Sequence, residues 1–473
     1  MSLLKQKAAT VREKRLQAIS AYYGKAETLL QENYEGQFVQ RVRTFSQDSQ
    51  SDILYALSII TTIKDSAIVV HGAAGCAVAR LFTNVIDENN AKWVVTNLNE
   101  RDSIMGSDVK LREAIRQVYN LHIPKIIFII STPIVAINND DIESVVEEQK
   151  EELGIAIVPV YSDGFRSKIG TTGYDLVSHS IIKHILLSDK AKFIDYVNLI
   201  SVSEKAADVK EVNSLLNKIG LKTNLFPRYA SFENIMQVNA TSYSVSINPD
   251  EANYPGIVLE NTFQIPFVQT VIPIGIDNTA RWIADIGIAT GHEAEARSLV
   301  DSEKERLNTI LLNKKGAINK LKVFISLSPA YAFGIADLLD ELGIELAGLK
   351  LSYIDQQHLG ILERIKTDKP DFAILVGDGQ LFEEENILRK LEPELYIGDS
   401  GDFAVAIRNG IPVVNLENIA ILGFNGVLNL ADKIRKVLSN TSFTQLISKK
   451  ETKSYTKEWL KKSPNWFIKQ EVK

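Results

Sequence analysis

Cysteine is almost absent from this sequence: Cys76 is the only one among 473 residues. A single thiol excludes an intrachain disulfide framework, and such scarcity is typical of the reducing cytoplasm. Long apolar runs are also missing, since no window approaches the roughly 18 apolar residues of a membrane-spanning helix. The charged N-terminal stretch lacks the apolar segment of a signal peptide. We therefore expect a cytoplasmic protein with no membrane partner.

Positive charge is not in excess, because 53 Lys and Arg face 59 Asp and Glu, for a formal net charge of -6. No basic block is present to neutralise phosphates, so we expect no nucleic-acid partner. The chain has no P-loop and no spaced Cys or His metal motif. Its six histidines are scattered, and we interpret them as surface or helix-end residues.

What the sequence does contain is typical of a globular protein, with 45% hydrophobic and 24% charged residues. Apolar, β-branched segments recur, with helical patterns between them, which predicts parallel sheets with crossover helices. The expected strand segments are 64–76, 125–137, 154–165, 193–203, 222–229, 238–247, 322–329, 344–353, 372–379, 395–401 and 411–416.

We therefore predict an α/β protein of three Rossmann-like domains with mostly parallel sheets around a central cleft. The expected parts are a helical arm (1–40), a first α/β domain carrying Cys76 (41–190), a second (191–320), a third (321–440) and a C-terminal tail (441–473).

Cys76 ends the segment HGAAGC at a predicted strand-to-helix junction. Gly72 and Gly75 would let a bulky group approach the backbone, and a helix N-terminus favours an anionic sulfur. A metal ligand or reactive thiol is one interpretation. A buried, inert thiol is the other, because a free cysteine often behaves as a small hydrophobe.

Two further segments have the composition of ligand contacts. Gly377 and Gly379 follow a predicted strand, where they would either approach a ligand or form a plain tight turn. Arg166 would either recognise an anionic group or make a structural salt bridge.

Several segments, in order, resemble the nitrogenase component 1 family, including its cofactor-scaffold and protochlorophyllide reductase relatives. HGAAGC resembles the family's H-G-x-x-G-C, whose cysteine ligates an iron–sulfur cluster. The other similar segments lie at 97–115, 131–149, 158–181 and 407–434, and the resemblance covers about residues 45–430. It is closer to the α-type subunits than to the β-type.

The departures from the family pattern concern the metal ligands. Thr132 stands where the family has a second cluster cysteine, and the third position falls in residues 45–52, where Asp48 and Asp52 offer oxygen ligands. The cysteine that holds the nitrogenase catalytic cofactor falls near Asn248, and no histidine stands in residues 415–424. We therefore expect no nitrogenase-type catalytic cofactor and no dinitrogen reductase.

The resemblance implies that Cys76 is a single donor to an iron–sulfur cluster at a subunit interface. A related subunit would supply the other ligands, so we prefer a hetero-oligomer, although a homodimer with oxygen ligands is possible. An ATP-dependent iron–sulfur reductase would dock over the Cys76 edge, and Arg166, Gly377 and Gly379 would line the substrate cleft. Three functions stay open: an oxidoreductase subunit, a scaffold for cluster assembly, and a partner-binding subunit without a cluster.

Overall fold

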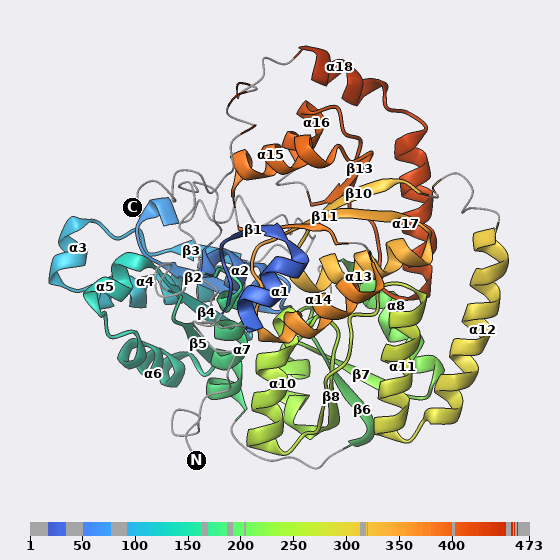
Figure 1. The fold of residues 1–473 in the computed structure, drawn as a ribbon. Coiled ribbons are helices and arrows are strands. Elements are labelled where there is room, and N and C mark those ends of the chain that lie inside the picture. Colours follow the sequence, from blue (N-terminus) through green and yellow to red (C-terminus); the bar gives the residue numbers. More distant parts are fainter. Residues whose placement is uncertain are drawn as a thin grey trace. The chain divides into compact units, whose positions relative to one another are not determined.

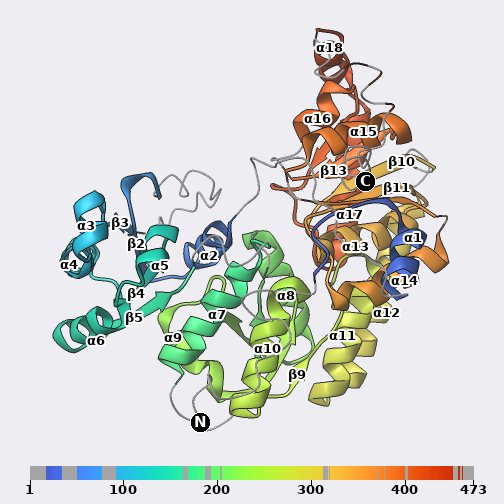
Figure 2. The ribbon, with the colours of Figure 1, turned by 60° about the vertical axis from the view of Figure 1, so that its left-hand side comes forward.

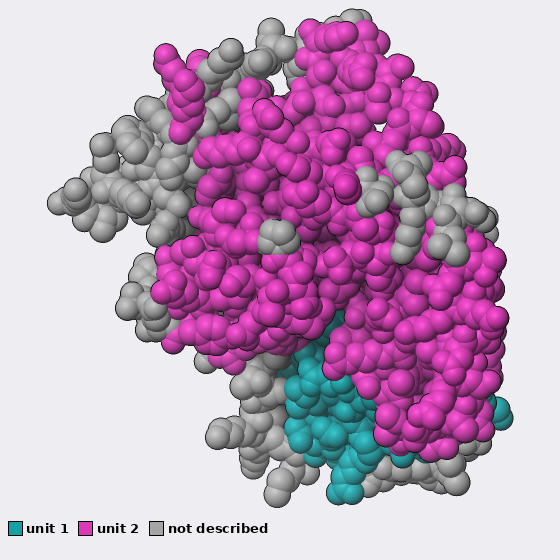
Figure 3. Space-filling model, turned by 45° about the vertical axis from the view of Figure 1, so that its right-hand side comes forward, with its two compact units in different colours: residues 1–16, 50–204, 220–270 teal, residues 17–49, 205–219, 271–473 magenta. Residues whose placement is uncertain are grey.

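The chain forms two compact units, each built from separate stretches of sequence (Figure 3). Unit 1 comprises residues 1–16, 50–204 and 220–270, and unit 2 comprises residues 17–49, 205–219 and 271–473. The computed structural model describes residues 18–34, 51–76, 92–162, 169–186, 193–202, 205–312, 318, 320–369, 371–377, 379–399, 403–450, 456, 458 and 461. Asp48 and Arg166 lie outside these described residues.

Unit 1 contains two four-stranded parallel sheets, of order β3-β2-β4-β5 and β7-β6-β8-β9 (Figure 1). The strands are β2 (Ser66–His71), β3 (Lys92–Val95), β4 (Ile126–Ser131), β5 (Ala156–Val160), β6 (Phe193–Ile200), β7 (Lys222–Phe226), β8 (Thr241–Ser246) and β9 (Phe267–Val268). The helices of unit 1 are α2 (Asp52–Ile60), α3 (Glu100–Met105), α4 (Asp108–His122), α5 (Pro133–Asn138), α6 (Ile142–Leu153), α7 (Thr172–Ile185), α9 (Phe232–Gln237), the 3-10 helix η3 (Val238–Ala240) and α10 (Pro249–Phe263).

The first sheet is covered on both faces, which explains its uninterrupted apolar strands. Alternate residues of β2 point to opposite sides: Ala67 and Val69 pack into one core cluster with α4 and α6. Ile68 and Val70 pack into another cluster with α2 and α7. Every residue of β2 and of β4 is buried. A period-two polar pattern is therefore absent because both faces of the sheet are core.

Unit 2 is built on a six-stranded sheet of order β1-β12-β11-β10-β13-β14, in which only β1 is antiparallel to its neighbour (Figure 2). Its strands are β1 (Tyr22–Lys25), β10 (Lys322–Ser326), β11 (Glu345–Leu351), β12 (Ala373–Val376), β13 (Leu395–Gly398) and β14 (Val413–Asn415). Its helices are α1 (Ala26–Tyr34), α8 (Ala206–Lys218), α11 (Ile276–Thr290), α12 (Glu293–Leu312), α13 (Pro329–Glu341), α14 (Gln356–Asp368), α15 (Leu381–Leu391), α16 (Phe403–Arg408), α17 (Gly423–Leu438) and α18 (Ser442–Lys450).

The α/β class with mostly parallel sheets is confirmed. Several predicted segments were longer than the strands they contain. In 125–137 the strand ends at Ser131 and α5 begins at Pro133, and 238–247 begins with the 3-10 helix η3. Proline suits the first position of a helix because its missing N–H would have no partner there. Residues 18–34, the described part of the expected helical arm, contain strand β1 as well as helix α1.

A buried arginine ties four elements of unit 1 together. Arg228, which follows β7, donates from Nε to Glu251 Oε2 at 2.9 Å and from Nη2 to Glu251 Oε1 at 3.1 Å. Its Nη1 donates to the Ser58 carbonyl oxygen at 2.8 Å, and its guanidinium lies 5.4 Å from the Tyr174 ring centroid. The side chain of Arg228 is fully buried. Helices α2, α7 and α10 thus share one charged group with the end of β7.

Helices α2 and α7 approach each other closely at Gly173. A Cβ at this position would overlap the carbonyl oxygen of Asp52 and lie 2.7 Å from the Ala56 amide nitrogen. Glycine is required here because only a residue without a side chain lets the two backbones touch. The crossing fixes the first turn of α2, which carries Asp52, against α7.

Candidate functional site

The candidate site lies at the carboxyl edge of the first sheet of unit 1, where ligand sites of parallel sheets usually lie. Strand β2 ends at His71, and Gly72 follows at once. A Cβ at Gly72 would overlap Thr132 Oγ1 and lie 2.8 Å from Thr132 Cγ2. The Thr132 hydroxyl donates to the His71 carbonyl oxygen at 2.8 Å. The segments that follow β2 and β4 are therefore packed directly against each other.

Cys76 lies in a short 3-10 turn over residues 74–76, in which its N–H donates to the Ala73 carbonyl oxygen at 2.9 Å. Its side chain is half-buried and packs against the core cluster shared by α2, β2, β4, β5 and α7. The expected helix after Cys76 falls in residues 77–91, outside the described residues. In the described part of the chain, no heavy atom beyond its chain neighbours lies within 4 Å of the place where a Cβ of Gly75 would be.

A chain of polar contacts runs from this turn to the following segments. His71 Nδ1 lies 3.1 Å from Thr96 Oγ1, and His71 Nε2 lies 3.0 Å from Ser107 Oγ. The Ser107 hydroxyl donates to Asp140 Oδ2. The Gly72 N–H donates to Thr96 Oγ1 at 2.9 Å, and the Thr96 hydroxyl is 3.1 Å from the Gly72 carbonyl oxygen. Gly72 is therefore held at both its N–H and its C=O.

The proton positions in this chain follow from the donors available. Ser107 has one hydroxyl proton and gives it to Asp140, so it faces His71 as an acceptor. His71 then donates from Nε2 to Ser107. In a neutral imidazole of this tautomer Nδ1 carries no proton, and the Thr96 hydroxyl gives its single proton either to Nδ1 or to the Gly72 carbonyl oxygen.

Burial lowers the pKa of His71 to about 4, while the carboxylate of Asp108 acts in the opposite direction. The folded protein therefore keeps His71 neutral at pH 7. Its interpretation as a surface or helix-end residue was wrong, because the side chain is fully buried at the end of β2. His358 is also buried, but it lies in the first turn of α14, which agrees with a helix-end position.

The low pKa of His71 predicts a loss of stability in acid. A histidine whose folded pKa lies below its unfolded value of about 6.5 stabilises fully above pH 6.5, and the contribution is lost as the pH falls towards 4. The shift from 6.5 to about 4 corresponds to about 3 kcal/mol at 1.36 kcal/mol per pKa unit. We expect His71→Gln to flatten the stability profile between pH 6.5 and 4, measured by urea unfolding. An unchanged slope would contradict the assignment.

The other sequence-predicted ligands are less favourably placed. Asp52 is buried in the first turn of α2, and Thr132 is committed to the His71 carbonyl. Within the described part of the chain, no group of three or more His, Cys, Asp or Glu side chains could hold a metal ion. The thiolate of Cys76 suits iron, but the described donors do not form a complete cluster site.

Asn248, near which the resemblance places the family's cofactor cysteine, has a structural role. Asn248 caps α10, because its side-chain oxygen accepts from the Asp250 N–H at 3.1 Å. Gly377 and Gly379 lie in unit 2, after β12, with φ of 154° and 59°. Both backbone conformations favour glycine, so the turn accounts for their presence without a ligand.

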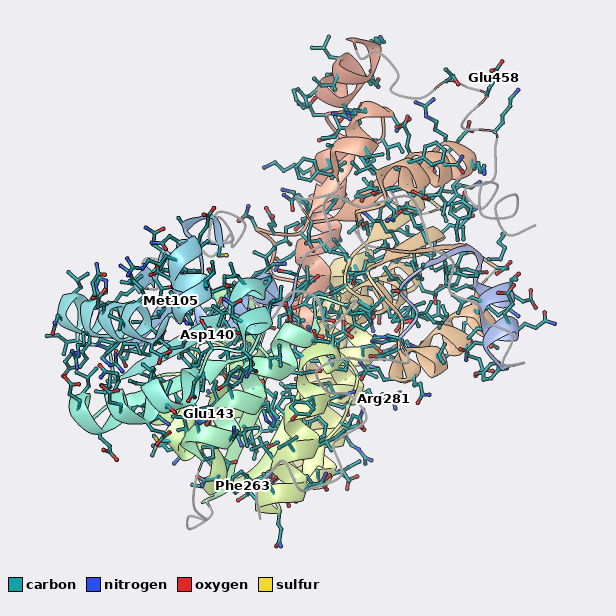
Figure 4. All side chains as sticks on the ribbon, turned by 90° about the vertical axis from the view of Figure 1, so that its left-hand side faces the viewer. Met105, Asp140, Glu143, Phe263, Arg281 and Glu458 are labelled. Atoms are coloured by element: carbon teal, nitrogen blue, oxygen red, sulfur yellow. The ribbon has the colours of Figure 1, made fainter. Side chains whose placement is uncertain are left out.

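An exposed apolar patch lies on the segments that follow β3 and β4. It consists of Ile104, Met105, Val109 and Ile137, whose exposed fractions range from 63% to 81%. Helices α3 and α5 are in contact, and Asn138 Nδ2 donates to the Ser103 carbonyl oxygen at 2.8 Å. Figure 4 shows Met105 and Asp140 on these neighbouring segments. Contiguous apolar residues in water commonly mark an interaction surface.

Sequence reasoning missed Thr96, Ser107 and Asp140. Each follows a strand or a short helix, and single Ser, Thr and Asp residues at such places are common in loops and caps. The sequence feature that could have revealed them is the parallel arrangement of β3 and β4 with β2, because it brings the segments after these strands to the same edge of the sheet. That signal required β3, and residues 92–95 were not among the predicted strands.

Comparison with known proteins agrees with this architecture. Residues 51–439 match the family described as nitrogenase component 1 type oxidoreductase. The chain belongs to this family, and the predicted resemblance is confirmed.

Individual relatives come from two groups within it. A nitrogenase iron-molybdenum cofactor biosynthesis protein NifE of Clostridium pasteurianum is 25% identical over 390 residues, covering 80% of this chain and 84% of that protein. A nitrogenase molybdenum-iron protein alpha chain of Methanosarcina barkeri is 24% identical over 352 residues, covering 70% and 65%.

The solved structure described as nitrogenase Cp1 at pH 5 has the same fold. The TM-score is 0.73 at 16% sequence identity, and the match covers 89% of this chain and 94% of that one. Among the described residues, we find no helix with the length and apolar character needed to cross a bilayer.

Proposed function

We propose that this chain is a cytoplasmic subunit of a nitrogenase-like component 1 oxidoreductase. Cys76 would be its one thiolate ligand to an iron–sulfur cluster at a subunit interface. The observation that carries the proposal is the place of Cys76. It is half-buried in a turn at the carboxyl edge of the sheet, and polar contacts link that turn to the segments of an exposed apolar patch.

The donor set supports a shared cluster. A cubane normally takes four thiolates or their substitutes, and this chain has one thiol. A related subunit with more cysteines would supply the rest, which makes a hetero-oligomer the preferred assembly. In a homodimer, carboxylates such as Asp48 and Asp52 would have to replace cysteines.

A bound cluster would supply one-electron transfer. The chain's own residues would hold its ligand in place: Gly72 allows close packing on Thr132, and Thr96 fixes both backbone groups of Gly72. These contacts keep the backbone before Cys76 from shifting. The half-buried position limits the access of water to the thiolate.

We further propose that the ATP-dependent iron–sulfur reductase docks on the apolar patch. Lys at position 105 would place a hydrated charge among the apolar contacts of that interface, where desolvating it is costly. We expect Met105→Lys to weaken reductase binding about tenfold or more, measured by biolayer interferometry on the assembled complex.

Leu121→Lys is the matched control for the docking test. Leu121 is also well exposed, but it lies at the C-terminal end of α4, about 20 Å along the helix from the patch end at 1.5 Å per residue. Equal binding by the two variants, or a stronger effect at Leu121, would rule out docking at the patch.

The cluster itself is tested by removing the thiol. The complex is purified anaerobically, iron and sulfide are quantified, and EPR spectra are recorded with and without dithionite. We expect Cys76→Ala to lose the reducible signal and most of the iron, and Cys76→Ser to retain part because oxygen is a weaker substitute ligand. Full iron retention in Cys76→Ala would refute the ligand role.

A scaffold for assembly of a nitrogenase-type metal cluster is the second candidate. The similarity to cofactor biosynthesis proteins named NifE favours it. The helix-capping role of Asn248 also favours it, because this side chain is used in the fold instead of holding a catalytic cofactor. Both observations support our proposal that the chain is not a dinitrogen reductase subunit. Turnover with electrons would favour the oxidoreductase, and cluster transfer to an acceptor protein would favour the scaffold.

A further inference from the structure

The apolar patch and the Cys76 turn are joined by a continuous set of polar contacts in unit 1. Ser107 lies between Met105 and Val109 in sequence, and Asp140 lies three residues after Ile137. Both segments of the patch therefore carry a polar side chain into the same buried cluster. The Ser107 side chain meets His71 Nε2 at 3.0 Å and donates to Asp140.

From His71 the contacts continue to the backbone of the turn. The imidazole holds the Thr96 hydroxyl at 3.1 Å, and Thr96 Oγ1 accepts from the Gly72 N–H at 2.9 Å. Gly72 also accepts from the Leu98 N–H at 2.9 Å. Cys76 is the fourth residue after Gly72, and residues 74–76 form the 3-10 turn.

We propose that Ser107 and Asp140 are positioning residues that couple the apolar patch to the Cys76 turn through His71. A partner bound to the patch would press on α3 and α5 and shift Ser107 against Asp140. Because Ser107 contacts His71, His71 contacts Thr96 and Thr96 contacts Gly72, the shift passes along these contacts to Gly72. The inference rests on the proposed function, since it takes the reductase as the bound partner.

The single cysteine makes this coupling measurable without a bound cluster. Alkylation of the purified full-length chain by iodoacetamide reports on Cys76 alone. We expect Ser107→Ala to raise the alkylation rate about fivefold or more, because His71 loses its acceptor at Nε2 and the hold on Gly72 weakens. Ser107→Thr retains the hydroxyl and should therefore show the wild-type alkylation rate. If Ser107 acted only by filling space, the larger threonine would not restore that rate.

Ser103→Ala is the matched control. Ser103 lies on α3 beside the patch, but its hydroxyl donates only within its own helix, to the Asn99 carbonyl oxygen at 3.0 Å. Its backbone carbonyl still accepts from Asn138 in the variant. The alkylation rate of Ser103→Ala should equal that of the wild type. The urea midpoint of each variant is measured in parallel, so that faster alkylation caused by a general loss of stability is identified.

Adding the reductase tests the coupling itself. It should change the alkylation rate of the wild type and of Ser103→Ala, but not of Ser107→Ala, with reductase affinity unchanged within about twofold in all three. Equal alkylation rates in Ser107→Ala and Ser103→Ala, or an equal reductase effect in both, would overturn the inference. If the wild type does not bind the reductase, the docking proposal is overturned instead. The alkylation rates measured without the reductase would still test the role of Ser107.

Discussion

Arg228→Ala is expected to lower the free energy of unfolding of unit 1 by about 3–5 kcal/mol, the range for breaking a buried ion pair from one side. The substitution leaves Glu251 buried without its cation, and the Ser58 carbonyl oxygen loses a donor. Removing the stacking on Tyr174 adds to the loss. Urea unfolding followed by tryptophan fluorescence and circular dichroism measures the change.

Arg112→Ala is the control for this prediction. Arg112 makes a bidentate pair with Glu148, with both N–O distances at 2.8 Å, but the pair is partly exposed. Surface pairs contribute about 0–1 kcal/mol, so the same chemical change should have little effect. Replacing both buried partners, as Arg228→Met with Glu251→Leu, should recover much of the loss. A cost below about 1 kcal/mol for Arg228→Ala would show that the buried pair is not required.

Gly173→Ala is expected to destabilise unit 1 by about 3 kcal/mol, at the upper end of the usual cost of overpacking. The new methyl group would overlap the Asp52 carbonyl oxygen and approach the Ala56 amide nitrogen to 2.7 Å. Both atoms belong to the backbone of α2, so no side-chain rotation can relieve the overlap. The helices must separate, and the apolar contacts between α2 and α7 weaken. Chemical unfolding measures the cost.

Gly360→Ala is a control in which the same substitution should raise the free energy of unfolding instead of lowering it. Gly360 lies in the interior of α14, and among the described residues outside its own helix backbone no atom lies within 4 Å of the Cβ that alanine would add. Alanine in a helix interior is favoured over glycine by about 0.5–1 kcal/mol. The same substitution should therefore stabilise at 360 and destabilise at 173. Stabilisation at both positions would refute the close backbone crossing.

The apolar strands could be predicted from sequence because burial on both faces leaves an uninterrupted signal. Strand β4 is the clearest case, with six buried residues in IIFIIS. Strand β3 was missed, since three of its four residues, Lys92, Trp93 and Val95, are only partly buried. Strand β1 was missed because its pairing with β12 joins segments far apart in the chain. No local pattern contains that information.

The site could be predicted only in part, for a related reason. The position of Cys76 after an apolar strand is a local feature, and the turn around it was visible in the sequence. The network of His71, Ser107 and Asp140 depends on three loops meeting at one sheet edge. His71 looked like an isolated histidine because its partners stand 25, 36 and 69 residues further along the chain.

The pairing of β1 with β12 also bears on how the protein is made. Lys25 pairs with Ala373 and Tyr22 with Val376, so on the ribosome the first strand must wait while about 350 residues are added, or about 20–70 s at 5–20 residues per second. Until then, β1 has no partner strand and stays open to pairing with other chains, and an unpaired strand edge is a route to aggregation. Unit 1 can complete its sheets by residue 268, well before unit 2. Translation speed between residues 270 and 376 should therefore affect the yield of soluble protein more than translation speed earlier in the chain.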